Sequence, residues 1–129
     1  MQMDLLNDAL VALRHADRDG KPHVEIAPTS KLIAEVLRIF REHHYIEEFT
    51  FVATGRGGKY DVSLSRRIND CGVIKPRLAV SFAALERFES RFLPAQDFGI
   101  LVLSTNQGVL SHQKARELKI GGRLLAYVY

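Results

Sequence analysis

Hydrophobic positions recur at helical spacing in the first third of the chain. Between residues 4 and 17 three leucines repeat every three or four positions, which predicts an amphipathic helix that Asp17–Gly20 ends. Residues 23–26 alternate between polar and apolar like a short strand. Ser30 is then placed to cap a second, longer helix. The apolar face of that helix would consist of Ile33, Leu37 and Phe40.

From Glu48 onward the hydrophobic period changes to two. Alternation on both sides of the glycine-rich segment Thr54–Gly58 predicts a β-hairpin, with glycine supplying positive φ in the turn. The predicted order helix, strand, helix and two strands forms an αβαββ unit, to which we assign residues 1–68. The side chains expected on one face of the hairpin are Phe49, Phe51, Ala53, Tyr60, Val62 and Leu64.

The pattern in residues 69–129 predicts a second, mostly β unit with short helices. The chain is therefore expected to be α+β, with two packed subdomains and a connector over residues 66–72. Ser111 is expected to cap the last helix. The elements expected in order are a strand over 73–78 with Pro76 at an edge or bulge, a helix ending at Pro94, an apolar strand over 99–103, a helix over 111–118 closed by Gly121 and Gly122, and a strand over 124–129.

Composition narrows the class of protein. With 47% hydrophobic and 26% charged residues, the sequence is that of a globular chain. No apolar run approaches the roughly 20 residues that span a bilayer, and the N-terminal Met1–Asp4 lacks the features of a signal peptide. The single cysteine, Cys71, has no partner for an internal disulfide. A soluble protein of the reducing cytoplasm, without membrane association, is expected.

Charge is unevenly distributed. Residues 1–68 hold 10 basic and 10 acidic side chains, whereas residues 69–129 hold 8 basic and 5 acidic ones. The whole net charge of +3 therefore lies in the second half. This excess is compatible with an anionic partner such as nucleic acid but does not require one.

The segment Ser104–Gly108 is the strongest candidate for binding chemistry. Two hydroxyls and an amide lie side by side after the apolar strand, and such groups bond to phosphate, ribose or base edges. The helix N-terminus at Ser111 would add N–H donors nearby. The same composition is also typical of an ordinary strand-to-helix turn, so both interpretations stay open on the pattern alone. The basic side chains that follow and can meet phosphates are Lys114, Arg116, Lys119 and Arg123.

Other chemistries find less support in the sequence. A hydrolase or transferase using Ser104 with His112 is the alternative, but the Gly-x-Ser-x-Gly context of a nucleophilic serine is absent. The adjacent His43 and His44 would point about 100° apart on a helix and cannot readily chelate one ion. Gly55–Gly58 lacks the Gly-Lys-Ser/Thr ending of a phosphate loop. We expect no metal and no cofactor.

A longer pattern connects this segment to a known family. A ribosomal signature has the spacing seen here in Gly99, the two aliphatic residues before Ser104-Thr105, Gly108 and Ala115-Arg116. The chain resembles the universal small-subunit ribosomal protein S-eight family over essentially its whole length. The further segments that carry the resemblance are Asp4–Ala16, Pro28–Leu32, Gly121-Gly122 and Tyr127–Tyr129, and those that resemble the archaeal and eukaryotic-type branch are Asn69–Arg77, Arg91–Pro94 and Ser111-His112.

The resemblance implies a structural, non-enzymatic constituent of the small ribosomal subunit that acts in translation. Such a protein binds a stem in the central domain of small-subunit (16S-type) rRNA early in assembly, within the cytoplasmic ribosome. Its other partners would be neighbouring small-subunit proteins and, by analogy, its own messenger RNA.

The resemblance also implies roles for individual residues. Ser104, Thr105 and Asn106 would read the RNA minor groove, and Gly108 would allow the turn. Ser30 and Lys31 would hold the RNA backbone from the first subdomain, while Lys114 and Arg116 remain the candidate phosphate contacts. Gly121 and Gly122 would allow close approach of the closing strand. Two departures from the family pattern are Asn106, where a third hydroxyl is usual, and Leu110, where methionine is common.

Overall fold

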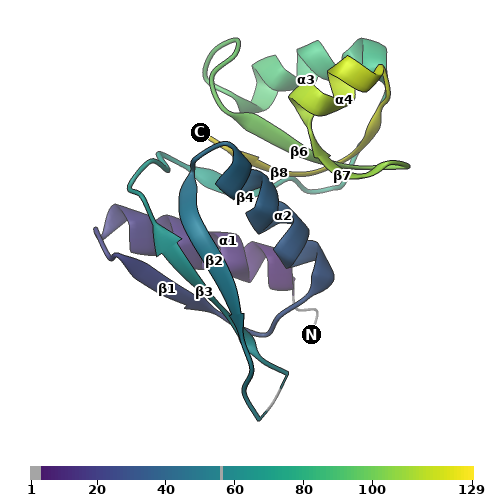
Figure 1. The fold of residues 1–129 in the computed structure, drawn as a ribbon. Coiled ribbons are helices and arrows are strands. Elements are labelled where there is room, and N and C mark those ends of the chain that lie inside the picture. The colour runs from purple at the N-terminus through teal and green to yellow at the C-terminus, as the bar shows by residue number, and fades with distance from the viewer. Residues whose placement is uncertain (1–3, 56) are drawn as a thin grey trace. The chain divides into compact units, whose positions relative to one another are not determined.

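The computed structural model describes residues 4–55 and 57–129, which form two compact units divided between Cys71 and Gly72 (Figure 1). Met1 to Met3, on which part of the signal-peptide expectation rests, and Arg56, in the predicted hairpin turn, lie outside the described residues. Each unit has its own sheet and its own helices, which confirms the predicted α+β class. Within the described ranges, no helix has both the length and the hydrophobicity needed to cross a bilayer.

The first unit follows the predicted αβαββ order. Its three-stranded sheet has the order β1-β3-β2, and helices α1 and α2 pack against it (Figure 1). The elements are α1 Leu5–Arg18, β1 His23–Ile26, α2 Lys31–Glu42, β2 Ile46–Val52 and β3 Lys59–Leu64. The apolar helix faces predicted from spacing are buried in this unit: Leu6, Leu10 and Leu13 of α1 and Ile33, Leu37 and Phe40 of α2.

The β2–β3 hairpin has the face predicted for it. Phe49 lies opposite Val62 and Phe51 opposite Tyr60, so these side chains project to one side of the sheet. Burial along this face is uneven, because Phe51 is 58% exposed although Tyr60, the residue opposite it, is buried. The predicted hairpin is therefore confirmed, with an aromatic side chain left in solvent near its tip.

The second unit is mostly β, as predicted, and contains a sheet of five strands. Strands β4, β8, β6 and β7 pair in that order, and β5 also pairs with β8. Helices α3 and α4 cover the face that carries the buried core of this unit (Figure 1). The elements are β4 Cys71–Val73, β5 Ala79–Val80, a 3₁₀ turn Phe82–Ala84, α3 Leu85–Phe92, β6 Ile100–Thr105, β7 Gly108–Ser111, α4 His112–Leu118 and β8 Gly122–Val128.

Two expectations for the second unit were wrong in detail. The strand expected over 73–78 is replaced by two short strands, β4 and β5, on either side of a turn. Pro76 lies in that turn, where a residue without a backbone N–H breaks no ladder. Helix α4 is closed by Lys119 in the left-handed conformation, with φ 58°, and Gly122 instead begins β8. The two glycines that were expected to end the helix therefore lie just before and at the start of the strand that follows it.

A third correction concerns the candidate binding segment. Residues 104–108 were expected to lead from a strand directly to a helix, yet they form the tip of a β-hairpin. Strand β7 was missed because its four residues are too few to show a period. Ser111 does cap α4 as predicted, and its Oγ accepts a hydrogen bond from the N–H of Lys114 at 3.1 Å.

Candidate functional site

A groove of about 730 Å³ in the second unit brings together most of the binding residues predicted there. One side is the tip of the β6–β7 hairpin, and the other is the start of β8 with the neighbouring β5 segment. The side chains and backbone that line it are those of Ser104, Thr105, Asn106, Gly121, Gly122 and Arg123, with Ala79–Ser81 and Ile120. Residues that are separated by more than a dozen positions in the sequence thus form one surface.

Thr105 shapes the tip of the hairpin. Its hydroxyl donates to the Gly108 carbonyl at 2.8 Å and accepts from the N–H of Gln107 at 3.0 Å. Gly108 has φ +106°, which favours glycine at this position. The side chains of Ser104 and Asn106, on either side of Thr105, are exposed. The hydroxyl proton of Thr105 is donated to a carbonyl within the turn. Ser104 and Asn106 are therefore the exposed side chains beside it that a ligand can reach.

Gly121 and Gly122 allow strands to approach closely at the back of the groove. A Cβ on Gly121 would lie 2.1 Å from the carbonyl oxygen of Val80, and one on Gly122 would lie 2.4 Å from that of Ser104. Real Cβ atoms do not come so close to backbone atoms, so any side chain here would push β8 away from β5 or β6. The two glycines therefore determine the shape of the groove without contributing a side chain to it.

Arg123 is a groove residue that the sequence did not single out. It was one of four basic residues near the C-terminus, and nothing in the sequence separated it from the others. The strand register places it directly opposite Ser104, and its guanidinium donates to the carbonyl of Arg77 at 3.3 Å. Its exposed side chain gives the groove a positive charge beside uncharged hydrogen-bonding groups.

Lys114 and Arg116 lie on α4 and do not line this groove. Lys114 is exposed and forms an ion pair with Glu117 at 3.6 Å. Arg116 forms an ion pair with Glu89 of α3, whose side chain is only 5% exposed. Both charges thus have a partner within the protein, but that of Arg116 is a buried carboxylate, whereas Lys114 and Glu117 are both exposed.

Ser30 and Lys31 begin α2 in the first unit. The Ser30 hydroxyl accepts from the N–H of Ile33 at 3.1 Å, and its carbonyl accepts from the Tyr60 hydroxyl at 3.0 Å. These bonds confirm the predicted cap and fix the start of the helix. Lys31 is exposed beside them. The cap leaves Lys31 as the charged group that this helix start offers to solvent.

The geometry excludes a catalytic pair of Ser104 and His112. The His112 side chain is 1% exposed, and its Nδ1 accepts a hydrogen bond from the backbone N–H of Leu101 at 3.0 Å. Its Nε2 faces the carboxylate of Glu89 at 3.7 Å. Both ring nitrogens are directed at buried groups, while Ser104 lies in solvent. A serine needs an adjacent base for nucleophilic catalysis, and this histidine does not supply one.

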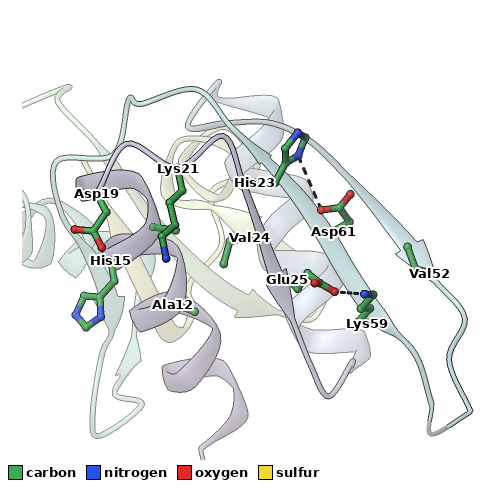
Figure 2. Close-up of a pocket in the computed structure, with 11 residues that line it drawn as sticks. Ala12, His15, Asp19, Lys21, His23, Val24, Glu25, Val52, Lys59 and Asp61 are labelled. Carbon is green, nitrogen blue, oxygen red and sulfur yellow. Dashed lines mark hydrogen bonds and ion pairs between the residues drawn. The ribbon is translucent and has the colours of Figure 1, made fainter.

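A second groove, of about 670 Å³, lies in the first unit beside α1 and the edge strand β1 (Figure 2). Its charged side chains are of both signs, and several are paired with one another. Lys59 forms an ion pair with Glu25, and His23 lies 3.9 Å from Asp61, as the dashed lines in Figure 2 mark. Opposite charges that neutralise each other do not favour a polyanion.

Across residues 4–55 and 57–129, no three metal-ligating side chains are grouped as an ion site.

Comparison with known proteins connects the whole chain to one family. A family model described as ribosomal protein S8 matches residues 4–129. The chain is 51% identical over 129 residues to the small ribosomal subunit protein uS8 of Picrophilus torridus, and the alignment covers all of both chains. It is 50% identical to the protein of the same name from Pyrobaculum neutrophilum, covering all of this chain and 99% of that one.

A third relative, the uS8 protein of Archaeoglobus fulgidus, is 48% identical over the full length of both chains. These sources are archaeal, in agreement with the branch that the sequence resembles. Because the family model and full-length relatives cover the hairpin, the groove and the first unit alike, the chain belongs to the ribosomal protein S8 family.

Proposed function

We propose that the chain binds a stem in the central domain of small-subunit rRNA, with the groove between the β6–β7 hairpin and β8 as its principal contact. Family membership makes it a structural, non-enzymatic constituent of the small ribosomal subunit. The observation that carries the proposal is the grouping of Ser104, Asn106 and Arg123 around one glycine-walled groove. We infer that it acts within the cytoplasmic ribosome, in assembly and translation.

The chemistry of the groove suits an RNA helix. A-form RNA presents its 2′-hydroxyls and base edges in a wide, shallow minor groove, while its major groove is too narrow for side chains. The Ser104 hydroxyl and the Asn106 amide can each donate and accept, so they match 2′-hydroxyls and base edges. Arg123 can meet a phosphate beside them. A few polar contacts of this kind give specificity without a large positive charge.

Other residues contribute outside the groove. Ser30 and Lys31 at the start of α2 form the proposed contact of the first unit with the RNA backbone. Lys114, exposed on α4, meets a phosphate from the second unit. We assign Arg116 an indirect role, because its charge is already paired with the buried Glu89. Gly108, Gly121 and Gly122 keep the backbone in the shape that the contacts require.

The test is a binding titration of the purified chain with the central-domain stem and with a plain RNA duplex, each at two salt concentrations. We expect tight, stem-selective binding. If about four phosphates are neutralised, log K falls against log salt with a slope of about −3 to −4. Equal affinity for both RNAs with a steep slope would show that the basic residues only attract phosphate, and it would overturn the proposal.

The remaining proposed partners are neighbouring small-subunit proteins and the chain's own messenger RNA. Repression of its own message requires that a segment of the transcript imitate the rRNA stem. A competition experiment decides this point, in which the encoding transcript is added to the preformed complex of the chain with the stem. Release of the stem by the transcript at comparable concentration is the expected result. Failure of the transcript to compete would remove the messenger RNA from the partners.

A further inference from the structure

The histidine that begins α4 replaces a strand residue at the base of the β6–β7 hairpin. The last pair between these strands is Val102 with Ser111, so a continued β7 would place residue 112 opposite Leu101. The backbone instead turns into α4 at His112. The imidazole Nδ1 then accepts the Leu101 N–H at 3.0 Å. A side chain thus supplies the acceptor that a further strand residue would have provided.

Two charged neighbours define the state of this ring. Because Nδ1 accepts an amide N–H, it carries no proton, and the neutral ring has its proton on Nε2. Nε2 faces the Glu89 carboxylate at 3.7 Å, which favours this tautomer electrostatically. Arg116, one helical turn beyond His112, forms an ion pair with the same carboxylate. Glu89 of α3 is therefore held between two residues of α4.

Strand β7 of this hairpin is supported on one side only, by its pairing with β6 and by the packing of α4. Strand β7 lies at the end of the sheet order, so among the described residues its outer edge pairs with no strand. Pairing between β6 and β8 reaches only as far as Ser104 opposite Arg123. The tip at Asn106 lies about four residue pairs, roughly 13 Å, from the Leu101–His112 bond at the base. Rotation of the base would displace the tip.

We infer that His112 is a positioning residue for RNA binding: its bond to Leu101, with the tautomer set by Glu89, aims the hairpin tip that carries Ser104 and Asn106. The inference rests on the proposed function, since it names a residue that supports the same groove without touching RNA. His112 itself is buried, so its side chain is not accessible to RNA. Its effect is transmitted through the orientation of two strands.

Three variants separate positioning from general stability. His112→Asn keeps an acceptor, because the Asn Oδ1 takes the place of Nδ1, whereas His112→Leu keeps the bulk without the acceptor. Ile74→Ala is the matched control, since it removes apolar contacts from the same core and lies outside β6, β7, α3 and α4. Each is titrated with the central-domain stem at a temperature where thermal melts show it to be folded. Leaving the buried Leu101 N–H unpaired is expected to weaken stem binding about tenfold in His112→Leu, with His112→Asn and Ile74→Ala within about threefold of wild type.

Nuclear magnetic resonance provides a readout that does not require RNA. Long-range ¹H–¹⁵N spectra of the free protein are expected to show the His112 proton on Nε2, and a proton on Nδ1 would overturn the inference. In His112→Leu the amide resonances of residues 104–108 are expected to shift, and in Ile74→Ala they are expected to stay.

The outcomes distinguish the two proposals. Stem-selective wild-type binding with equal affinity for all three variants overturns the positioning role and leaves the proposed function intact. A wild type without preference for the stem overturns the proposed function. In that case unchanged 104–108 resonances in His112→Leu would also overturn the dependence of the hairpin on His112.

Discussion

The two hairpins of the chain reverse direction in different ways. In the β2–β3 hairpin, Gly57 and Gly58 adopt positive φ, and the exposed ring of Phe51 lies where a Cβ on Gly58 would be. In the β6–β7 hairpin a two-residue turn is closed by the Thr105 hydroxyl, and only Gly108 at its end has positive φ among the residues described there. The first tip therefore has two glycines with positive φ and a Thr54 hydroxyl that accepts from the Gly58 N–H, whereas the second has one such glycine and a Thr105 hydroxyl that both donates and accepts.

This difference has a functional consequence. Three of the five described residues between β2 and β3 are glycines, so that turn carries few functional groups. In the second turn the Thr105 hydroxyl is bonded to backbone, while its neighbours Ser104 and Asn106 are exposed. The β8 strand beside them adds Arg123. The comparison teaches that the tip proposed to bind RNA differs from the other tip in the side chains that it exposes. Four changes to the two hairpins and their neighbours test this.

The largest effect is expected for Gly122→Ala at the wall of the groove. Its Cβ would lie 2.4 Å from the Ser104 carbonyl oxygen, so β6 and β8 must separate. We expect the free energy of unfolding to fall by about 3 kcal/mol or more, and stem binding to fall with it. Gly55→Ala in the β2–β3 turn is the control, because nothing lies within 4 Å of its Cβ. Equal urea midpoints for the two variants would contradict the close approach.

Thr105→Ala removes both hydrogen bonds that close the second tip. The expected loss is about 1–2 kcal/mol of unfolding free energy and about tenfold or more in stem affinity, and Thr105→Ser should recover most of both. The matched control is Thr54→Ala, since the Thr54 hydroxyl accepts from the Gly58 N–H at 3.0 Å in the first tip. That variant should lose similar stability without losing stem affinity. Urea unfolding and RNA titration measure the two quantities.

Asn106→Ala tests a side chain that the fold does not use. Asn106 is exposed at the tip, so the free energy of unfolding should stay within about 0.5 kcal/mol of wild type. Stem affinity should fall by a factor of about five to ten if one hydrogen bond to RNA is lost. Asn106→Ser, which introduces the hydroxyl usual in the family, should bind within about threefold of wild type. Unchanged affinity for the alanine variant would remove this side chain from the contact.

The smallest effect is expected on the salt dependence of binding. Arg123→Gln removes the groove's positive charge, and the slope of log K against log salt should become shallower by about one. Lys114→Gln is expected to change the slope by no more than this, with little change in stem selectivity. In both variants Gln removes the charge and keeps a shorter, polar side chain. If Arg123→Gln leaves the slope unchanged while Lys114→Gln reduces it, phosphate contact lies on α4 and not in the groove.

Much of the fold was readable from short stretches of sequence. The caps at Ser30 and Ser111 and the buried helix faces of the first unit were correctly predicted, because each involves residues within one or two helical turns. Failures occurred where an element was too short to carry a period, as with β7, and where a proline turn divided the expected 73–78 strand. Gly122, which begins β8, and Gly121 just before it were likewise assigned to a helix end.

For the candidate site, too, some features were predicted from the sequence and others were not. The polar segment 104–108 and the family pattern were visible in the sequence, since they depend on residue identity and spacing alone. Three features of the site could not be predicted from the sequence. The Thr105 hydroxyl donates its hydrogen bond within the turn, Arg123 lies opposite Ser104, and His112 is buried with its ring bonded to Leu101. Each depends on the register between strands and on the packing of helices against them. Periodicity and capping act between neighbours along the chain, but a groove is made by contacts between distant residues, and only the packed sheet brings those together.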